Sequence, residues 1–274
     1  MLELLQDLFS YAFILRALIV GTLVSLCAAL LGVSLVLKRY SMIGDGLSHV
    51  GFGALAVAMA LHWAPLPVAI PVVVAAAFFL LRLSENSKIK GDSAIALIAS
   101  SALAVGVTVI SLSSGQNIDI YSYLFGSILA MQESDVYLSI GLSAVVLILF
   151  VLCYNKIFAV TFDETFAKAS GCKAGLYNML IALLTALTIV VGMRIMGTML
   201  ISSLIIFPAL SAMRIFSRFF SVVVAAAVTS VVCFFVGLVV SYAFSTPTGA
   251  SIVLANLIAF LLCMSIGAIF KKST

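Results

Sequence analysis

Nine apolar runs, each long enough to cross the hydrocarbon core of a bilayer as a helix, follow one another along the chain. They cover residues 12–37, 45–63, 65–83, 93–112, 135–153, 176–193, 196–213, 220–243 and 249–270. Only 9% of the residues are charged and 64% are hydrophobic, whereas about 25% of the residues in a soluble domain are charged. We therefore expect an all-α integral membrane protein, a polytopic helical bundle of about nine spans that forms a single transmembrane domain over residues 1–274.

The connections between the runs bear on the number and direction of the spans. Only Arg194 and Ile195 separate the sixth run from the seventh, so eight to ten spans are compatible with the sequence. Basic residues gather in every second connection, which is typical of cytoplasmic loops. They are Lys38, Arg39, Arg82, Lys88, Lys90, Lys156, Lys168, Lys173, Arg214, Arg218, Lys271 and Lys272. We expect the N-terminus outside and the C-terminus in the cytoplasm, with Arg16 and Arg194 as basic exceptions on the outer side.

Two connections are expected to contain short helices. Residues 113–134 are too polar to span a membrane, yet they carry the apolar patch YLFGSILAM, which is typical of an interfacial or re-entrant helix on the outer face. Residues 154–175 form the largest cytoplasmic connection, and within it residues 162–170 indicate a short amphipathic helix. Asp163 and Glu164 suit the first turn of that helix.

Asp45 and His49 lie at the start of the second run and form the only acid–histidine pair at helical spacing in a span. Residues four apart share one face of a helix, so the pair indicates half of a divalent-metal site or one end of a proton relay. Ser48 lies beside them and offers a further oxygen. The alternative is structural: Asp45, after Gly44, would cap the helix, and His49 would be a buried neutral ring. With a helix that begins near Tyr40, the pair would lie about one to three turns from the cytoplasmic surface.

The junction of the sixth and seventh runs holds further candidates. Met193, Met196 and Met199 lie there, and we expect them to pack rather than bind a soft metal. The seventh run also contains Ser202, Ser203, Pro208 and Ser211. Proline frees a backbone carbonyl within a span, and such a carbonyl either faces a pathway or marks a kink.

The remaining residues and motifs favour structure over chemistry. His62 stands beside Trp63 at the outer end of the second run, where we expect an interfacial ring rather than a ligand. The five cysteines have no C-x-x-C spacing. The chain has no G-x-x-x-x-G-K-[ST] phosphate loop, no H-E-x-x-H and no G-x-S-x-G. We therefore expect no enzyme activity, and transport driven by ATP would need a separate ATPase.

Five sequence blocks resemble the membrane permeases of ATP-binding-cassette importers for zinc and manganese, the ABC-3 type of bacterial metal-uptake system. They are LKRYSMIGDGLSHVGFGALA at 37–56, YLFGSILAMQESD at 123–135, FDETFAKASG at 162–171, MGTMLISSLIIFPALSA at 196–212 and SYAFSTPTGASIVL at 241–254. The blocks run nearly from end to end of the chain in the order of the family. Together they are far more specific than any single block.

The resemblance implies a transport subunit with no permanently bound cofactor. Asp45 and His49 would face the metal path, and the carried ion would be zinc first and manganese second. Two copies would form a homodimer in the cell (inner) membrane of a bacterium, with ATP-binding-cassette ATPase subunits on the cytoplasmic side. A soluble metal-binding protein would deliver the ion outside, and import would proceed by alternating access. The ATPase-coupling helix would comprise Phe162, Asp163, Glu164, Ala167, Ser170 and Gly171.

Two other functions stay compatible with the sequence. A permease for a metal chelate or a vitamin would need a roomy cavity, and Asp45 and His49 would then be structural. A stand-alone proton-coupled carrier would use the pair as its proton relay and would transport without an ATPase. The net charge of +4 does not indicate nucleic-acid binding.

Overall fold

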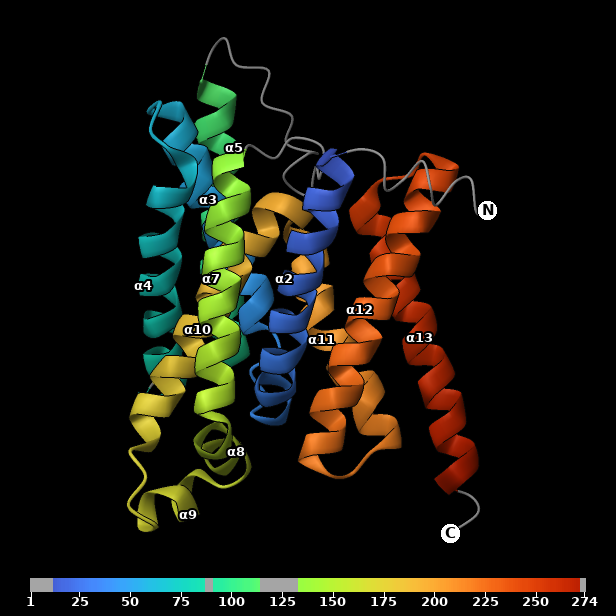
Figure 1. Cartoon of the computed structure of the whole chain (residues 1–274). Coiled ribbons are helices and arrows are strands. Elements are labelled where there is room, and N and C mark those ends of the chain that lie inside the picture. The colour runs from blue at the N-terminus through green and yellow to red at the C-terminus, as the bar shows by residue number, and fades with distance from the viewer. Residues whose placement is uncertain (1–11, 87–90, 114–132, 272–274) are drawn as a thin grey trace.

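The computed structural model describes residues 12–86, 91–113 and 133–271, and within them the chain forms helices and no strand. The helices are α2 (Ala12–Leu37), α3 (Ile43–Ala60), α4 (Pro65–Asn86), α5 (Gly91–Leu112), α7 (Glu133–Leu152), α8 (Tyr154–Phe162), α9 (Glu164–Ala169), α10 (Ala174–Met196), α11 (Thr198–Ile215), α12 (Phe219–Phe244) and α13 (Thr248–Lys271). Nine of them are long and apolar enough to cross a membrane. Figure 1 shows these long helices side by side, with α8 and α9 together at one end of the bundle.

The expected all-α bundle is confirmed, and the expected spans correspond one to one with the nine long helices. The weak boundary between the sixth and seventh spans is a real break, because Gly197 adopts a positive φ of 86° between α10 and α11. Glycine has no Cβ and enters this region without steric cost. The helix expected over residues 113–134 lies outside the described residues except at its ends, and so do residues 87–90 of the polar stretch 84–92, among them Lys88 and Lys90.

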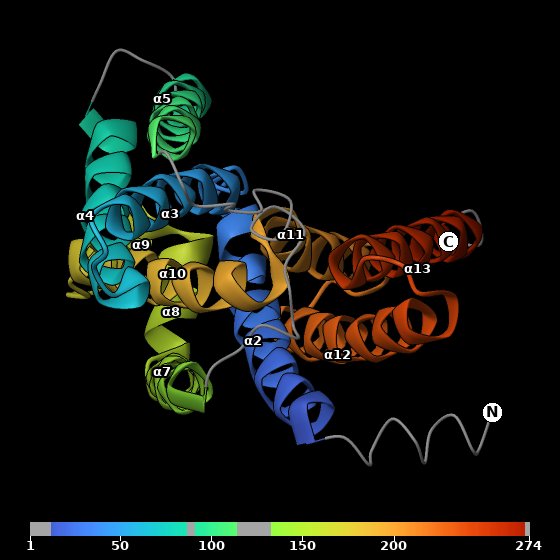
Figure 2. The ribbon, with the colours of Figure 1, turned by 90° about the horizontal axis from the view of Figure 1, so that it is seen from above.

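α2 lies at the centre of the bundle and divides it into two groups (Figure 2). It packs against α7, α10, α11 and α12, while α3 packs between α4 and α5 on one side. On the other side, α13 packs against both α11 and α12. Gly32 allows the tightest approach of α2 to α11, because a Cβ there would lie 2.0 Å from the carbonyl oxygen of Ile205. Small residues at such crossings let helices within a membrane approach closely.

Two arginines that break the positive-charge pattern are neutralised at the end of the bundle opposite α8 and α9. Arg16 of α2 forms an ion pair with Glu133 at the start of α7. Arg194, near the end of α10, donates from Nε and Nη2 to Oδ2 of Asp135, at 3.0 and 2.7 Å. Asp135 is buried, and an opposite charge offsets part of the cost of desolvating it. The expected direction of the termini across the membrane stays a prediction.

Candidate metal-binding site

Asp45 and His49 come together on α3 as their spacing predicts. Nε2 of His49 lies 3.7 Å from Oδ2 of Asp45, so a single ion could contact both side chains. The side chain of Asp45 is 42% exposed and that of His49 is 22% exposed, which leaves both accessible to a ligand. Asp45 stands in the first turn of the helix, but it is not the cap: the N-cap is Met42, and no side chain caps it. The capping alternative for Asp45 is therefore wrong.

A hydroxyl from a distant part of the chain joins the pair. Ser202 Oγ of α11 lies 3.4 Å from Oδ1 of Asp45 and also donates to the carbonyl of Thr198, at 3.2 Å. Ser202 was one of several serines in its run, and nothing in the sequence singled it out, because it lies 157 positions from Asp45. Ser48 behaves differently from the expectation. It is buried and its hydroxyl donates to the carbonyl of Asp45 at 2.7 Å, which makes it a backbone partner rather than a third oxygen ligand.

Two buried polar atoms near this contact lack a hydrogen-bond partner. They are Nδ1 of His49 and Oγ1 of Thr198. A buried polar group without a partner costs about 1–3 kcal/mol, so a bound ion or its hydration water would lower that cost. No third histidine, cysteine or acidic side chain completes a cluster in the part of the chain that the structure describes. The site thus offers one carboxylate, one imidazole and one hydroxyl, an incomplete set that suits transient binding.

The pair lies deeper in the bundle than expected. From Ser202, α11 continues to Ile215 for about 20 Å at its usual rise per residue. The end at Ile215 is the one where α8 lies, because Phe219, at the start of α12, contacts Phe158 of α8. A helix beginning near Tyr40 would have placed Asp45 only about 7 Å in. The difference arises because α11 extends beyond the start of α3, so that α3 begins inside the bundle.

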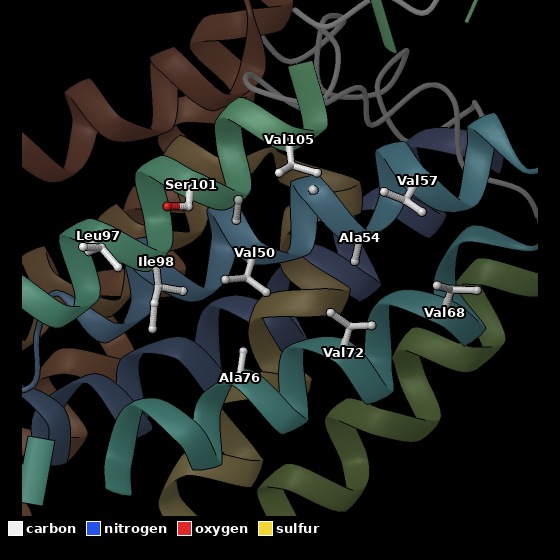
Figure 3. Close-up of a pocket in the computed structure, with 12 residues that line it drawn as sticks. Val50, Ala54, Val57, Val68, Val72, Ala76, Leu97, Ile98, Ser101 and Val105 are labelled. Carbon is white, nitrogen blue, oxygen red and sulfur yellow. The ribbon is translucent and has the colours of Figure 1, made fainter. Parts of the chain in front are cut away.

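An apolar pocket of about 490 Å³ lies between α3, α4 and α5, separate from the three polar side chains (Figure 3). Val50 and Val57 of α3, Val72 of α4 and Leu97 of α5 line it, and Ser101 is its one polar lining side chain. The pocket therefore has no ligand set for an ion. It also offers few hydrogen-bond partners to a polar chelate or vitamin.

The other candidates near the sixth and seventh spans are structural. Met193 is buried and packs where α3 lacks a side chain, because a Cβ on Gly51 would lie 2.3 Å from its sulfur. Met196 is buried as well, whereas Met199 is exposed, so the methionines do not form a soft-metal site. Pro208 lies inside α11, which continues through it. All five cysteines are free.

His62 follows α3 in the turn before α4 and lies away from the pair. Its backbone adopts a positive φ of 55°, and its neighbour Trp63 is 59% exposed. These features agree with a residue at the end of the bundle.

The expected short helix in the 154–175 connection is present, but it is one of two. Phe162 ends α8, Asp163 is extended, and α9 begins at Glu164. Asp163 caps α9, since its carboxylate accepts a hydrogen bond from the Phe166 amide at 2.9 Å. Helix α8 was not expected. Its aromatic residues Phe158 and Phe162 pack around Phe219, with ring centroids at 5.0 and 6.1 Å.

The residues expected to couple to an ATPase fall into two groups on this helix pair. Phe162 is exposed and Ser170 and Gly171 form the exposed end of α9, where Gly171 has a φ of 79°. Ala167 is buried against α8 and α10 and holds α9 in place. Phe166, which sequence reasoning did not select, is 68% exposed.

Glu164 forms ion pairs with both Lys38 and Lys168. Hydrogen bonds from Lys168 and Asn178, together with the positive charge of Lys38, lower the pKa of Glu164 to about 2. The carboxylate is therefore ionised throughout the physiological range.

The chain is similar to known proteins along nearly its whole length. The profile of the ABC 3 transport family matches residues 10–267. The manganese import system permease protein ScaB of Streptococcus gordonii is 30% identical over 259 residues, which cover 94% of this chain and 93% of ScaB. The probable iron transport system membrane protein of Haemophilus influenzae is 31% identical, over 95% of this chain and 92% of its own length. The structure of PsaBC from Streptococcus pneumoniae in complex with Fab contains a chain with a TM-score of 0.85 and 31% identity, covering 95% of this chain and 94% of that one.

Proposed function

The chain belongs to the ABC 3 transport family, and from that membership we propose that it is the membrane permease of an importer for a divalent metal ion. It is a multi-pass protein of the bacterial cell membrane and a transport subunit rather than an enzyme, so ATP hydrolysis falls to a separate chain. The observation that carries the metal assignment is the meeting of Asp45, His49 and Ser202 deep in the bundle. A carboxylate and an imidazole within reach of one ion are common ligands of divalent transition metals.

We propose manganese ahead of zinc as the carried ion, which reverses the order expected from the sequence. The relative ScaB is named for manganese import, and this supports manganese. Two of the three candidate donors are oxygens, from Asp45 and Ser202, and oxygen ligands suit manganese. Zinc binds mixed nitrogen and oxygen sites more tightly, so it stays the second candidate.

Transport by alternating access would use the site as a station on the path. A metal-binding protein would deliver the ion at the end of the bundle opposite α8 and α9. ATPase subunits would dock at the α8–α9 end, where Phe166 is exposed. Asp45 and His49 would hold the ion while the helices move, so that the site opens first to the outside and then to the cytoplasm. An incomplete ligand set favours this, because a site that binds too tightly cannot release its ion.

The same proposal includes pairing of two copies and one transmembrane domain over the whole chain. In the most apolar stretch of α13 only 11% of the residues are buried, and in that of α5 22%, against 67% in that of α2. Such surfaces face either lipid or a second copy. The mass of the complex with its ATPase in detergent, corrected for bound detergent, separates one permease copy from two.

Uptake measured in cells that carry the complete transporter tests the site. Asp45→Asn and His49→Ala are each expected to abolish accumulation of radiolabelled manganese, while the amount of protein in the membrane stays unchanged. His62→Ala controls for loss of a histidine, and Ser203→Ala controls for Ser202→Ala, because Ser203 donates to the carbonyl of Leu200 instead. We expect Ser202→Ala to weaken uptake severalfold, since a hydrogen bond as long as 3.4 Å is worth about 1 kcal/mol at most.

The results distinguish the competing functions. Normal uptake in both the Asp45 and the His49 variants would remove the metal-path role. Uptake of zinc but not of manganese would restore the order expected from the sequence. Uptake of an intact metal chelate with neither free ion transported would favour the chelate permease. Transport by the permease alone, without an ATPase, would be the result of a stand-alone carrier.

A further inference from the structure

Lys38 directly follows α2 and begins the turn that leads into α3. Its ammonium donates to three oxygens on three other helices: the carbonyl of Val160 on α8 at 3.1 Å, Oε2 of Glu164 on α9 at 3.3 Å, and Oδ1 of Asn178 on α10 at 2.7 Å. An ammonium group has three donors, so one side chain ties together three helices. The Lys38 side chain is only 9% exposed.

The acceptors of Lys38 are themselves bonded to each other. Nδ2 of Asn178 donates to Oε2 of Glu164 at 3.0 Å, and Lys168 approaches Oε1 of Glu164 at 2.8 Å. Asn178 is buried. Removal of Lys38 would leave its buried partners unsatisfied, which makes this contact hard to break and α9 hard to move without Lys38.

The chain between Lys38 and the metal pair is held in a fixed shape. Arg39 adopts a positive φ of 62°, its amide donates to the carbonyl of Val36, and the amide of Tyr40 donates to the carbonyl of Leu35. This is the hydrogen-bond pattern of a Schellman end to α2. The amide of Ile43 then donates to the carbonyl of Tyr40 at 3.0 Å and begins α3. A displacement of Lys38 is therefore passed to the first turn of α3, where Asp45 lies.

The α8–α9 pair has a second attachment, but it leads elsewhere. Phe158 and Phe162 of α8 pack on Phe219, at the start of α12. In the described part of the chain, α8 and α9 pack mainly on α2, α7 and α10 and on each other, and α3 is not among their principal neighbours. Lys38 joins the helix that faces the expected ATPase to the helix that carries Asp45 and His49.

We infer that Lys38 is the positioning residue that transmits movement of α9 to the metal pair. Its contacts with Glu164 and Asn178 make the end of α2 follow α9, and the fixed turn makes the start of α3 follow the end of α2. An ATPase that pulls on α9 would thereby change the position of Asp45 relative to Ser202 on α11. This inference rests on the proposed function, because it assigns a path for coupling within that transporter.

The test compares coupling in Lys38→Met and Arg39→Met. The full complex of permease, ATPase and metal-binding protein is reconstituted in liposomes, and manganese uptake and ATP hydrolysis are measured on the same samples. Arg39→Met is the matched control, since it removes the same charge from the same turn and Arg39 is exposed. We expect Lys38→Met to lower the number of ions carried per ATP about tenfold, within the range of typical coupling free energies. We expect Arg39→Met to keep the wild-type ratio.

A second variant guards against misfolding of Lys38→Met. Glu164→Gln keeps the size of the side chain and removes the negative charge that faces Lys38 and Lys168. It leaves Lys38 its contacts with Val160 and Asn178, so it should lower the ratio by a smaller factor than Lys38→Met. The double variant should be no worse than Lys38→Met alone, because both changes break the same contact. Size-exclusion profiles and thermal midpoints report whether each complex is folded.

The outcomes separate the inference from the proposed function. A wild-type ratio of ions to ATP in Lys38→Met would overturn the inference while leaving the metal permease intact. If Lys38→Met does not assemble, a wild-type ratio in Glu164→Gln overturns it instead. Independent, multiplicative losses in the double variant would also refute a shared contact. Absence of ATP-dependent manganese or zinc uptake by the wild type would overturn the proposed function itself.

Discussion

Replacing Gly32 with alanine should loosen the crossing that places α11 beside α3. The new Cβ would lie 2.0 Å from the carbonyl oxygen of Ile205, whereas a carbon–oxygen contact of this kind is comfortable at about 3.3 Å. The oxygen belongs to the backbone of α11 and cannot rotate away, so α2 and α11 must separate by about 1 Å. Ser202 lies about one turn from Ile205, and the same displacement disturbs its contact with Asp45.

Two opposing effects determine how much Gly32→Ala lowers the free energy of unfolding. Overpacking of this kind costs about 3 kcal/mol at its upper range, and alanine in place of glycine within a helix returns about 1 kcal/mol. The net loss of about 2 kcal/mol corresponds to a fall of roughly 4–8 °C in the thermal midpoint for a chain of this size. Manganese uptake should fall with it, because the Asp45–Ser202 contact depends on the position of α11.

The assay is thermal unfolding in detergent, with uptake measured in parallel. Gly141→Ala is the matched control: Gly141 lies on α7, and a Cβ there meets nothing within 4 Å. That variant should keep the wild-type midpoint or raise it by a few degrees. A Gly32→Ala protein as stable as the wild type, or an equal loss in Gly141→Ala, would mean that the close approach of α2 to α11 does not determine stability.

Three further outcomes are expected from other contacts. Asp135→Asn should destabilise the protein by about 3 kcal/mol, because Arg194 would be left without its charged partner. The thermal midpoint measures this loss, and an unchanged midpoint would mean that the ion pair contributes little to stability. Phe166→Ser should abolish stimulation of the ATPase without altering the midpoint, since the ring is exposed, and normal stimulation would place the partner contact elsewhere. The pKa of Glu164 is lowered from 4.5 to about 2, so its contribution to stability is present above pH 4.5 and is lost as pH falls toward 2. Thermal midpoints measured across this pH range should therefore fall more steeply in the wild type than in Glu164→Gln. Parallel curves for the two proteins would contradict a stabilising role of the Glu164 carboxylate.

The nine spans were predictable because a long apolar segment in lipid must satisfy its own backbone hydrogen bonds, and a helix does so within the segment. The pairing of Asp45 with His49 was predictable for a similar reason, since it depends only on spacing along one helix. The cap of α9 by Asp163 is also local. These features need no knowledge of how the helices pack.

Features that depend on packing could not be predicted. Ser202 joins Asp45 from a helix 157 positions away, and hydrophobicity does not set the relative heights of α3 and α11. Arg16 and Arg194 seemed to break the charge pattern because their acidic partners lie far along the chain, on α7. Ser48 was a candidate for a further oxygen ligand, but its hydroxyl donates to the carbonyl of Asp45 in its own helix.

The meeting of α3 and α11 also shapes the field that an ion would experience. α3 begins at Ile43 and α11 begins at Thr198, about 3 and 6 Å along their axes from Asp45 and Ser202. The macrodipole of a helix places about half a positive charge at its N-terminus, so two such partial charges converge near one carboxylate. They would repel a cation that arrives. In a metal site built on Asp45 and Ser202, this repulsion would weaken binding and so favour rapid release of the ion.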